Sequence, residues 1–370
     1  MKRVCVVITA RPSYSRIKSA LVALRARSDV HLQIVAAASA VVTRFGRVVD
    51  QIRADGFEVD AEVSSVVEQD TLGNSALSTG LLTMQLAGTF ERLKPDVVVT
   101  IADRHETLAT AIAASYQHIP LCHVQGGEVT GSIDDKVRNS ITQLADIHCV
   151  ATEVAAMRVQ RKIAQGHTSN GVLYTPTLQP INASIHVTGC PSIDLAAEAL
   201  RLGPSKKSGV IVLQHSVTDE ADQAAAQMRA TIEAVGTDAM YFWPGEDAGG
   251  SAMAKELRLA GIKPIRSLPP LEFLRLLLGC EVLVGNSSVG IRECSFLGVP
   301  VVNIGTRQQG RERGRNVVEV LQHDPDALRT AVRWATDPRY EVIRSTLYGD
   351  GHAGERIAAV LAGKAKEAAA

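Results

Sequence analysis

The residues best suited to chemistry stand where apolar runs of the sequence end. Residues 285–293 (GNSSVGIRE) follow the apolar run Glu281–Val284 and lead into a predicted helix. The free N–H groups of a first helical turn bind anions, and small side chains let a phosphate approach that backbone. Residues 306–316 follow the next run and carry four arginines that can add charged hydrogen bonds: Arg307, Arg311, Arg313 and Arg315. Together these segments predict a site for a nucleoside diphosphate.

Carboxylates gather after two apolar runs in the first half of the chain. Asp103 and Glu106 follow the run Asp96–Ile101, although both would also suit the cap of the next helix. A second group follows the run Leu121–Val124 and two glycines: Glu128, Asp134 and Asp135. Carboxylates held at turns can transfer protons. We therefore favour a functional role for the second group over a solvated face.

Arg11 and His215 also follow apolar runs, and each alone would suit a structural role. If the runs are parallel strands, their carboxyl ends share one edge of a sheet, where ligands usually bind. The fold would then gather Arg11, Asp103, Glu128, His215 and Ser287 at one cleft.

Two other sets of residues are interpreted as structural. Phe273 and Trp243 could stack on a nucleotide base, but core packing is the favoured interpretation. His118 and His123 flank a helix-to-strand junction and share no face, so we reject a metal pair.

Strands that alternate with helices would position these residues. Apolar runs typical of buried parallel strands lie at Arg3–Ile8, His31–Ala37, Asp96–Ile101, Leu121–Val124, His148–Ala151, Gly209–Leu213, Met240–Trp243, Glu281–Val284 and Val299–Ile304. Helix-length segments such as Tyr14–Arg27 and Glu106–Gln117 separate them. This alternation predicts an α/β protein with doubly wound sheets. The Gly-, Ser-, Thr- and Pro-containing segment His167–Ile185 is the predicted linker between two such domains.

The composition fits a two-domain globular enzyme. The chain has 370 residues, 46% of them hydrophobic and 21% charged. Equal counts of 39 basic and 39 acidic residues give no overall attraction to nucleic acid or an anionic membrane. The six cysteines lack metal-type spacing, and we find neither a signal peptide nor a membrane-spanning run. We expect a cytoplasmic protein.

With these segments the sequence resembles the UDP-N-acetylglucosamine 2-epimerases over nearly its whole length, and it is most similar to the hydrolysing branch of sialic-acid-type pathways. The matching segments are 11–18 (RPSYSRIK), Asp103-Arg104, 123–135 (HVQGGEVTGSIDD), 187–195 (VTGCPSIDL), 285–294 (GNSSVGIREC) and 298–317 (GVPVVNIGTRQQGRERGRNV). The resemblance implies the glycosyltransferase-B architecture, two Rossmann-like domains with a central cleft. We place these domains at residues 1–170 and 186–347, with residues 348–370 packing back on the first.

The resemblance also implies a reaction and its residues. These enzymes invert C2 of the sugar by expelling UDP to form a 2-acetamidoglucal, to which water or UDP then adds. The acid and base candidates are Asp103, Glu128 and either Asp134 or Asp135, with His215 at the diphosphate. The predicted contacts to the UDP-sugar are Arg11, Ser13, Glu106, Arg138, His215, Ser287, Ser288, Gly290, Glu293, Arg307 and Arg313, of which Glu293 matches the ribose-binding glutamate. No metal or other cofactor is expected, and the expected assembly is a homodimer or homotetramer.

Three positions depart from the family pattern. Hydrolysing members usually have Arg-His where this chain has Arg138-Asn139, Gly at Ala102, and His-Pro at His215-Ser216. Asparagine does not titrate near pH 7 as histidine does. A non-hydrolysing enzyme that releases UDP-N-acetylmannosamine therefore stays open, although the Gly-Thr-Arg-Pro-Glu segment of that branch is absent. We favour hydrolysis.

Three further alternatives remain. The substrate could be a 4-acetamido-6-deoxy UDP-sugar, because no identified residue reads C4 and C6. A glycosyltransferase would share the architecture but would need an acceptor. A non-catalytic nucleotide-sugar binder would share the site, although the intact carboxylates and His215 favour an enzyme.

Overall fold

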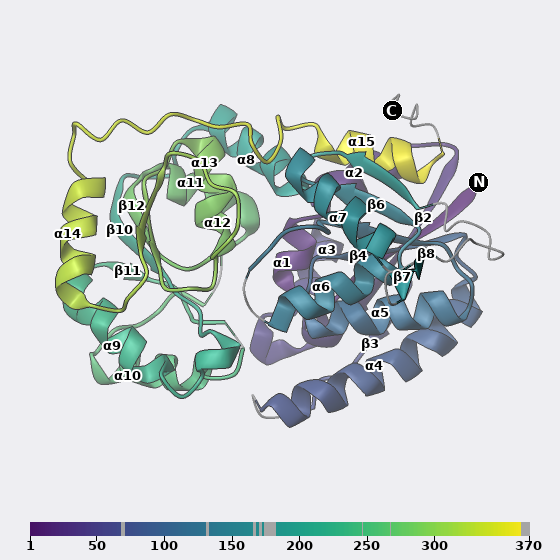
Figure 1. Cartoon of the computed structure of the whole chain (residues 1–370), viewed down its shortest axis with the longest axis horizontal. Helices are drawn as coiled ribbons and strands as arrows, with labels where there is room; N and C mark the ends of the chain where they lie inside the picture. The colour runs from purple at the N-terminus through teal and green to yellow at the C-terminus, as the bar shows by residue number, and fades with distance from the viewer. Residues whose placement is uncertain are drawn as a thin grey trace.

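The computed structural model describes residues 1–67, 71–130, 133–165, 168–169, 172–173, 183–245, 247–266 and 268–363. The chain forms two lobes, each built on a parallel sheet with helices packed against it (Figure 1). The predicted α/β class, with two Rossmann-like domains, is confirmed.

The first lobe contains a seven-stranded sheet in the order β3-β2-β1-β4-β5-β6-β9, in which all neighbours are parallel. Its strands are β1 (Lys2–Ile8), β2 (Val30–Ala37), β3 (Ala61–Val63), β4 (Val97–Ile101), β5 (Leu121–Val124), β6 (Ile147–Val150) and β9 (Ser184–Val187). Its helices are α1 (Arg11–Ser15), α2 (Lys18–Arg25), α3 (Val48–Ala54), α4 (Leu72–Leu93), α5 (His105–Tyr116), α6 (Ile133–Leu144), α7 (Glu153–Gln165) and α15 (Ala353–Leu361).

The central strands of this sheet are buried on both faces. In β1, Val4 and Val6 pack into one hydrophobic cluster with residues of α2, whereas Cys5 and Val7 pack into another with residues of α4 and α5. Successive side chains of a strand point to opposite faces, which explains the uninterrupted apolar run. Full burial of each valine stabilises the fold by about 1.5–3 kcal/mol before entropy costs.

The second lobe contains a five-stranded parallel sheet in the order β11-β10-β12-β13-β14. Its strands are β10 (Ser208–Leu213), β11 (Met240–Tyr241), β12 (Cys280–Gly285), β13 (Val301–Ile304) and β14 (Val317–Val320). Its helices are α8 (Pro191–Leu202), α9 (Ala224–Val235), α10 (Gly250–Leu259), α11 (Pro270–Leu278), α12 (Ser288–Ile291), α13 (Glu293–Leu297) and α14 (Pro325–Ala335). The 3-10 turns η1 (Ala38–Val41), η2 (Thr43–Phe45) and η3 (Thr218–Glu220) complete the two lobes.

The last residues of the predicted linker His167–Ile185 belong to a strand of the first sheet. Ser184 and Ile185 belong to β9, which pairs with β6 in the first sheet, so that sheet extends beyond the predicted domain end at residue 170. The two-residue strands β7 (Thr168–Ser169) and β8 (Val172–Leu173) form a small antiparallel ladder before it. The other residues of the predicted linker, apart from Ala183, lie outside the described residues. The chain enters the second lobe at α8, after β9.

The segment predicted as one helix, Tyr14–Arg27, is two helices. Helix α1 ends at Ser15 and α2 starts at Lys18. The break leaves Arg16 in the connection, at the carboxyl edge of the first sheet.

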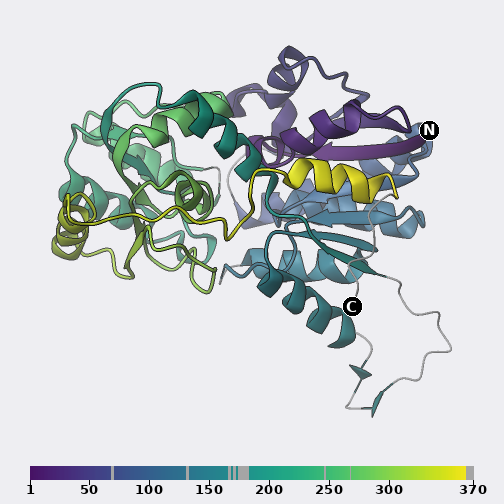
Figure 2. The ribbon, with the colours of Figure 1, turned by 90° about the horizontal axis from the view of Figure 1, so that it is seen from above.

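The last described helix returns to the first lobe. Figure 2 shows α15 lying beside α2, and residues of both helices share one hydrophobic cluster. Asp194 of α8 accepts hydrogen bonds from the backbone N–H groups of Ala353 (2.9 Å) and Gly354 (2.7 Å). Asp194 thus caps α15 from another helix.

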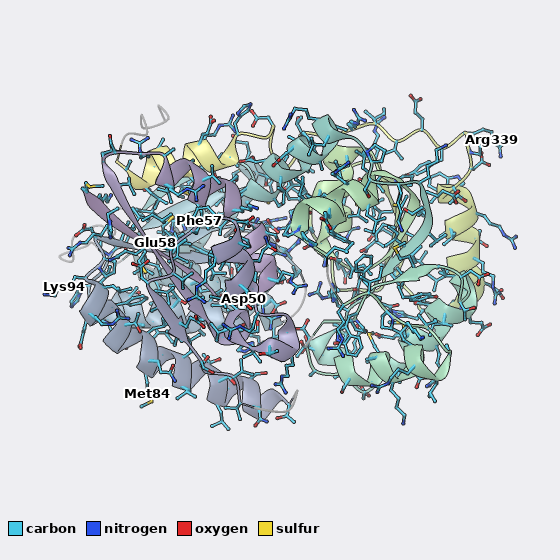
Figure 3. The ribbon with its side chains drawn as sticks, turned by 180° about the vertical axis from the view of Figure 1, so that it is seen from behind. Asp50, Phe57, Glu58, Met84, Lys94 and Arg339 are labelled. Carbon is cyan, nitrogen blue, oxygen red and sulfur yellow. The ribbon has the colours of Figure 1, made fainter. Side chains whose placement is uncertain are left out.

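Helix α4 lies along the outside of the first lobe. It is 22 residues long, and Met84 on it points away from the lobe in Figure 3 and is 75% exposed. Neither α4 nor any other helix of the described residues combines the length and the apolar character needed to cross a bilayer.

Candidate active site

Loops at the carboxyl ends of strands in both lobes line two joined cavities. The larger, about 340 Å³ and here called the large cavity, is lined by residues that follow β1, β10, β11 and β12. The smaller, about 40 Å³ and here called the small cavity, is lined by residues that follow β4, β5, β12 and β13. Arg16, Ser288 and Arg307 line both cavities. The site therefore lies between the two sheets.

The large cavity is rich in positive charge. Among the residues that the structure describes, five arginines and two carboxylates line it: Arg11, Arg16, Arg104, Arg266 and Arg307, with Asp247 and Glu293. Asp247 lies between two of the guanidinium groups, 3.1 Å from Arg104 and 3.7 Å from Arg307. Such a wall suits a polyanion, because guanidinium groups form charged, directional hydrogen bonds with phosphate.

His215 contributes a neutral donor to the large cavity. Its Nδ1 accepts a hydrogen bond from the backbone N–H of Gly245 at 3.0 Å. Burial and the nearby Arg307 lower the pKa of His215 to about 3. The neutral ring therefore carries its proton on Nε2, which can donate to a phosphate oxygen.

The predicted phosphate segment starts a helix, as expected, but the helix is short. The Ser287 hydroxyl accepts a hydrogen bond from the Val289 N–H at 3.5 Å, and α12 ends at Ile291. The Ser288 hydroxyl accepts hydrogen bonds from Arg16 Nη2 at 3.0 Å and Arg292 Nη2 at 2.8 Å. Ser288 thus links an arginine of the first lobe to the helix start.

Gly290 has a packing role in α12. A Cβ atom at this position would come 2.8 Å from Cγ1 of Val301 on β13. Glycine therefore lets α12 lie close to the sheet, and Gly290 does not line either cavity.

The far wall of the large cavity is apolar. Phe242 and Phe273 are in edge-to-face contact, with ring centroids 5.0 Å apart, and Trp243 also lines the cavity. The sequence interpretation of Trp243 and Phe273 as core residues is therefore incomplete, because both also face this space. Glu293, 7% exposed, lines the same cavity.

Asp103 enters the small cavity as a paired carboxylate. Its Oδ2 accepts a hydrogen bond from Arg138 Nη2, and its side chain is 15% exposed. Burial opposes ionisation, but Arg138, Arg16 and Arg311 outweigh it and hold the pKa of Asp103 well below its usual range. Asp103 is therefore ionised at neutral pH.

Glu128 is held by arginines of the second lobe. Its Oε2 lies 3.0 Å from Arg311, and its Oε1 lies 3.2 Å from Arg292. Burial raises the pKa of Glu128, but the attraction of Arg311, Arg292 and Arg138 prevails and lowers it. Glu128 both lines the small cavity and joins the lobes.

Asp134 differs from these two carboxylates. It lines the small cavity, and burial together with the negative charge of Asp103 raises the pKa of Asp134 to about 6. It therefore exchanges a proton near neutral pH, which suits a general acid.

Asp135 lies behind the cavity. Its Oδ1 accepts hydrogen bonds from the Thr130 N–H (2.9 Å) and hydroxyl (3.0 Å) and from Arg138 Nη1. Arg138, 1% exposed, also donates to the Glu128 carbonyl at 2.7 Å. Neither Asp135 nor Arg138 lines a cavity, and together they support Asp103.

Three further predicted contacts also lie away from the cavities. The Ser13 hydroxyl is bonded to the backbone of Ala10, donating to its carbonyl at 2.6 Å. Glu106 pairs with Arg104 at 3.1 Å. Arg313 donates to the Gln308 carbonyl at 2.6 Å and pairs with Glu319.

Arg16, Arg292 and Asp247 are site residues that sequence reasoning missed. Arg16 and Arg292 line the small cavity, and Asp247 lines the large one. The segments RPSYSRIK and GNSSVGIREC contain the two arginines, so a search of these segments for cations could have found them. Asp247 belongs to none of the matching segments, so only the structure reveals its position.

Comparisons with known proteins show which sequences and folds this chain resembles. The protein-family model for UDP-N-acetylglucosamine 2-epimerase matches residues 22–362 of this chain. A UDP-N,N'-diacetylbacillosamine 2-epimerase (hydrolyzing) of Legionella pneumophila is 30% identical, over 96% of this chain and 94% of that protein. A UDP-N-acetylglucosamine 2-epimerase of Neisseria meningitidis is 29% identical, over 86% and 83%.

A solved structure shares the fold. The UDP-GlcNAc 2-epimerase from Neisseria meningitidis bound to UDP-GlcNAc aligns with a TM-score of 0.76 and 16% identity, over 97% of this chain and 99% of that one.

Proposed function

The chain belongs to the UDP-N-acetylglucosamine 2-epimerase family, and we propose on this basis that it inverts C2 of a UDP-N-acetylhexosamine and releases UDP by hydrolysis. The reaction would eliminate UDP to give a 2-acetamidoglucal. Water would then add at C1 while C2 receives a proton on the opposite face.

The observation that carries the proposal is the junction of the two cavities. A cationic large cavity with an apolar wall suits a nucleoside diphosphate. The small cavity beside it holds three carboxylates of unlike proton affinity. A UDP-sugar across the junction would have its diphosphate among arginines and its hexose among acids and bases.

The large cavity would hold the leaving group. Arg11, Arg16, Arg307 and the Nε2–H of neutral His215 would stabilise the charge that develops on UDP as the C1–O bond breaks. The Glu293 carboxylate would accept hydrogen bonds from the ribose hydroxyls.

In the small cavity we assign proton transfer to two carboxylates. Ionised Asp103 would remove the C2 proton, and Asp134 would return one on the other face. This division follows from their pKa values, which the surroundings shift in opposite directions. Glu128, paired with Arg292 and Arg311, would remain an anion and stabilise positive charge at C1.

Two observations support hydrolysis over return of UDP to C1. The name of the Legionella pneumophila relative specifies hydrolysis. Asn139, which departs from the family pattern, is not among the described residues that line either cavity. The change therefore leaves the cavity walls intact.

A second candidate substrate is a UDP-sugar with a 4-acetamido group and no C6 hydroxyl. The name of the same relative supports it, because that protein acts on UDP-N,N'-diacetylbacillosamine.

Proton NMR in D₂O tests the proposal with each of the two UDP-sugars in turn and no acceptor. Free UDP with a C2-deuterated, C2-inverted free sugar is the expected result. A deuterated mixture of UDP-sugars would overturn hydrolysis in favour of UDP return. If UDP binds but C2 keeps its proton with both substrates, the epimerase assignment fails. The Asp103→Asn variant serves as the inactive control.

A further inference from the structure

A buried histidine lies behind the proposed base. His123 on β5 is fully buried, and its Nε2 lies 2.9 Å from the carbonyl oxygen of Ala102. A carbonyl oxygen only accepts hydrogen bonds, so the proton of the ring is on Nε2. His123 therefore donates to the residue that precedes Asp103.

The surroundings keep this imidazole neutral and fixed. Burial lowers the pKa of His123 to about 4, despite the hydrogen bond to Ala102. Gly126 gives the ring its space, because a Cβ atom there would come 2.9 Å from His123 Nδ1. Gly126, the first glycine of residues 125–128 (QGGE), thus leaves room for the ring of His123.

Ala102 needs this support. Its φ of +66° lies in the left-handed region, which is unfavourable for a residue with a Cβ atom. Its N–H donates to the Val124 carbonyl at 2.9 Å, and its own carbonyl accepts from His123. Both peptide groups of Ala102 are therefore held by β5, and they set the direction in which the next side chain, Asp103, leaves the backbone.

We propose that His123 is a positioning residue for Asp103, which it orients through the carbonyl group of Ala102. The role of Asp103 as base rests on the proposed function, whereas the geometry of Ala102 does not. The carboxylate is then supported twice: His123 fixes its backbone through the Ala102 carbonyl, and Arg138 donates a hydrogen bond to its Oδ2.

Three substitutions separate this role from simple packing. His123→Leu removes the donor at similar size. His123→Gln keeps an N–H group near the position of Nε2, whereas the amide of His123→Asn matches Nδ1 and falls short of Ala102. We expect the His123→Leu and His123→Asn variants to have a kcat about 10-fold to 100-fold lower, because small displacements of a reacting group have such effects. KM and UDP affinity should change less than about twofold, and Gln should recover most of the rate.

A double-variant cycle tests the route through Ala102. Glycine adopts positive φ without the penalty of alanine, so the Ala102→Gly background needs the histidine less. His123→Leu should therefore cost several-fold less in kcat there than in the wild type. Equal losses in both backgrounds would show that His123 does not act through Ala102.

Other outcomes would also overturn the proposal. An unchanged kcat in His123→Leu would do so, as would a rise in KM that matches the loss of kcat. Loss of a limb of the pH profile in His123→Gln would also do so, because it would show that the ring itself transfers protons.

Crystal structures of the wild type and His123→Leu provide a readout that does not depend on turnover. We expect the variant to lose the left-handed conformation at residue 102 and to shift Asp103 away from Arg138. An unmoved Ala102 overturns the proposal even if the wild type turns over no UDP-sugar. If only the proposed function fails, the wild type will be inactive, but residue 102 and Asp103 will still change position in the His123→Leu structure.

Discussion

Burial and charged neighbours together decide which of the carboxylates that line the small cavity can hold a proton. Asp103 and Glu128 are paired with guanidinium groups, so both favour the ionised form. Burial and the negative charge of Asp103 raise the pKa of Asp134 to about 6. One cavity thus presents two anions and one group that titrates near neutrality, as a proton-transfer site requires.

The pH dependence of kcat/KM tests the assignment of Asp134 as the acid. An acid must be protonated in the free enzyme, so the rate should fall about tenfold per pH unit above a pKa of about 6. Asp134→Asn should lose this limb and at least about 100-fold in rate, whereas the exposed control Asp238→Asn should keep both. A rate that rises through the same pH range would assign Asp134 as the base instead.

Asp134 should also lower the stability of the protein at neutral pH. The pKa of Asp134 is about 6 in the folded protein, above the ordinary value of 3.8 for an aspartic acid. The stabilising contribution of the protonated carboxyl group is therefore fully present below pH 3.8 and is lost as the pH rises through about 6. Asp134→Asn should therefore raise the free energy of unfolding at pH 7.5 by about 1–3 kcal/mol. Urea unfolding at pH 7.5 and pH 4.5 measures the difference, which should shrink at the lower pH. A variant less stable than the wild type at pH 7.5 would contradict the prediction.

The sequence indicates which residues follow strands but not the direction of each side chain. Asp103, Glu128 and Asp134 reach the small cavity, whereas Asp135 points to Thr130 and Arg138. Asp134 and Asp135 are neighbours on one helix, so they point in different directions, and no pattern in a single sequence indicates which one faces the cavity.

At the scale of elements, the central strands of both parallel sheets were predicted, as was the edge strand β11, whereas the other three edge strands were not. Strands such as β4 are buried throughout, which gives continuous apolar runs. The missed strands β3, β9 and β14 lie at sheet ends and are only partly buried. An exposed edge tolerates polar residues, so the Ser184–Val187 segment (SIHV) lacks the apolar signal.

The cap on α15 makes a testable contribution to the first lobe. Asp194→Ala removes the acceptor for the Ala353 and Gly354 N–H groups, which should cost about 0.5–2 kcal/mol. Hydrogen exchange at residues 353–361 should accelerate, with little change in β1. The exposed Glu355→Ala variant is the control on the same helix. Unchanged exchange in α15 would show that packing on α2 alone holds the helix.

At the scale of the whole molecule, two neighbouring connections join the lobes. The chain crosses after β9 and again before α15, and the Cys190 N–H donates to the Tyr348 carbonyl at 2.7 Å. We propose domain boundaries at these crossings, near residues 188–190 and 348–351. The homo-oligomer and the cytoplasmic location expected from the sequence stay predictions.

Charged pairs across the cavities also hold the lobes together, and one of them occupies the region proposed for the diphosphate. Asp247 of the second lobe pairs with Arg104 of the first and with Arg307. Arg104 and Arg307 lower the pKa of Asp247 against the effect of burial, so it is an anion at neutral pH. A diphosphate brought near these arginines would compete with this carboxylate.

Asp247→Asn should therefore bind UDP more tightly than the wild type. The substitution keeps the size of the side chain but removes the negative charge that competes with phosphate for Arg104 and Arg307. We expect this change to raise UDP affinity about 3-fold to 10-fold, or about 0.7–1.4 kcal/mol. Titration calorimetry at two salt concentrations measures the gain, which should be larger at low salt because salt screens the attraction between charges in a solvent-accessible cavity. Asp238→Asn, exposed in the same lobe, is the matched control. Equal or weaker binding of UDP would show that Asp247 supports the arginines in the bound state, and that the interlobe pair remains when the nucleotide binds.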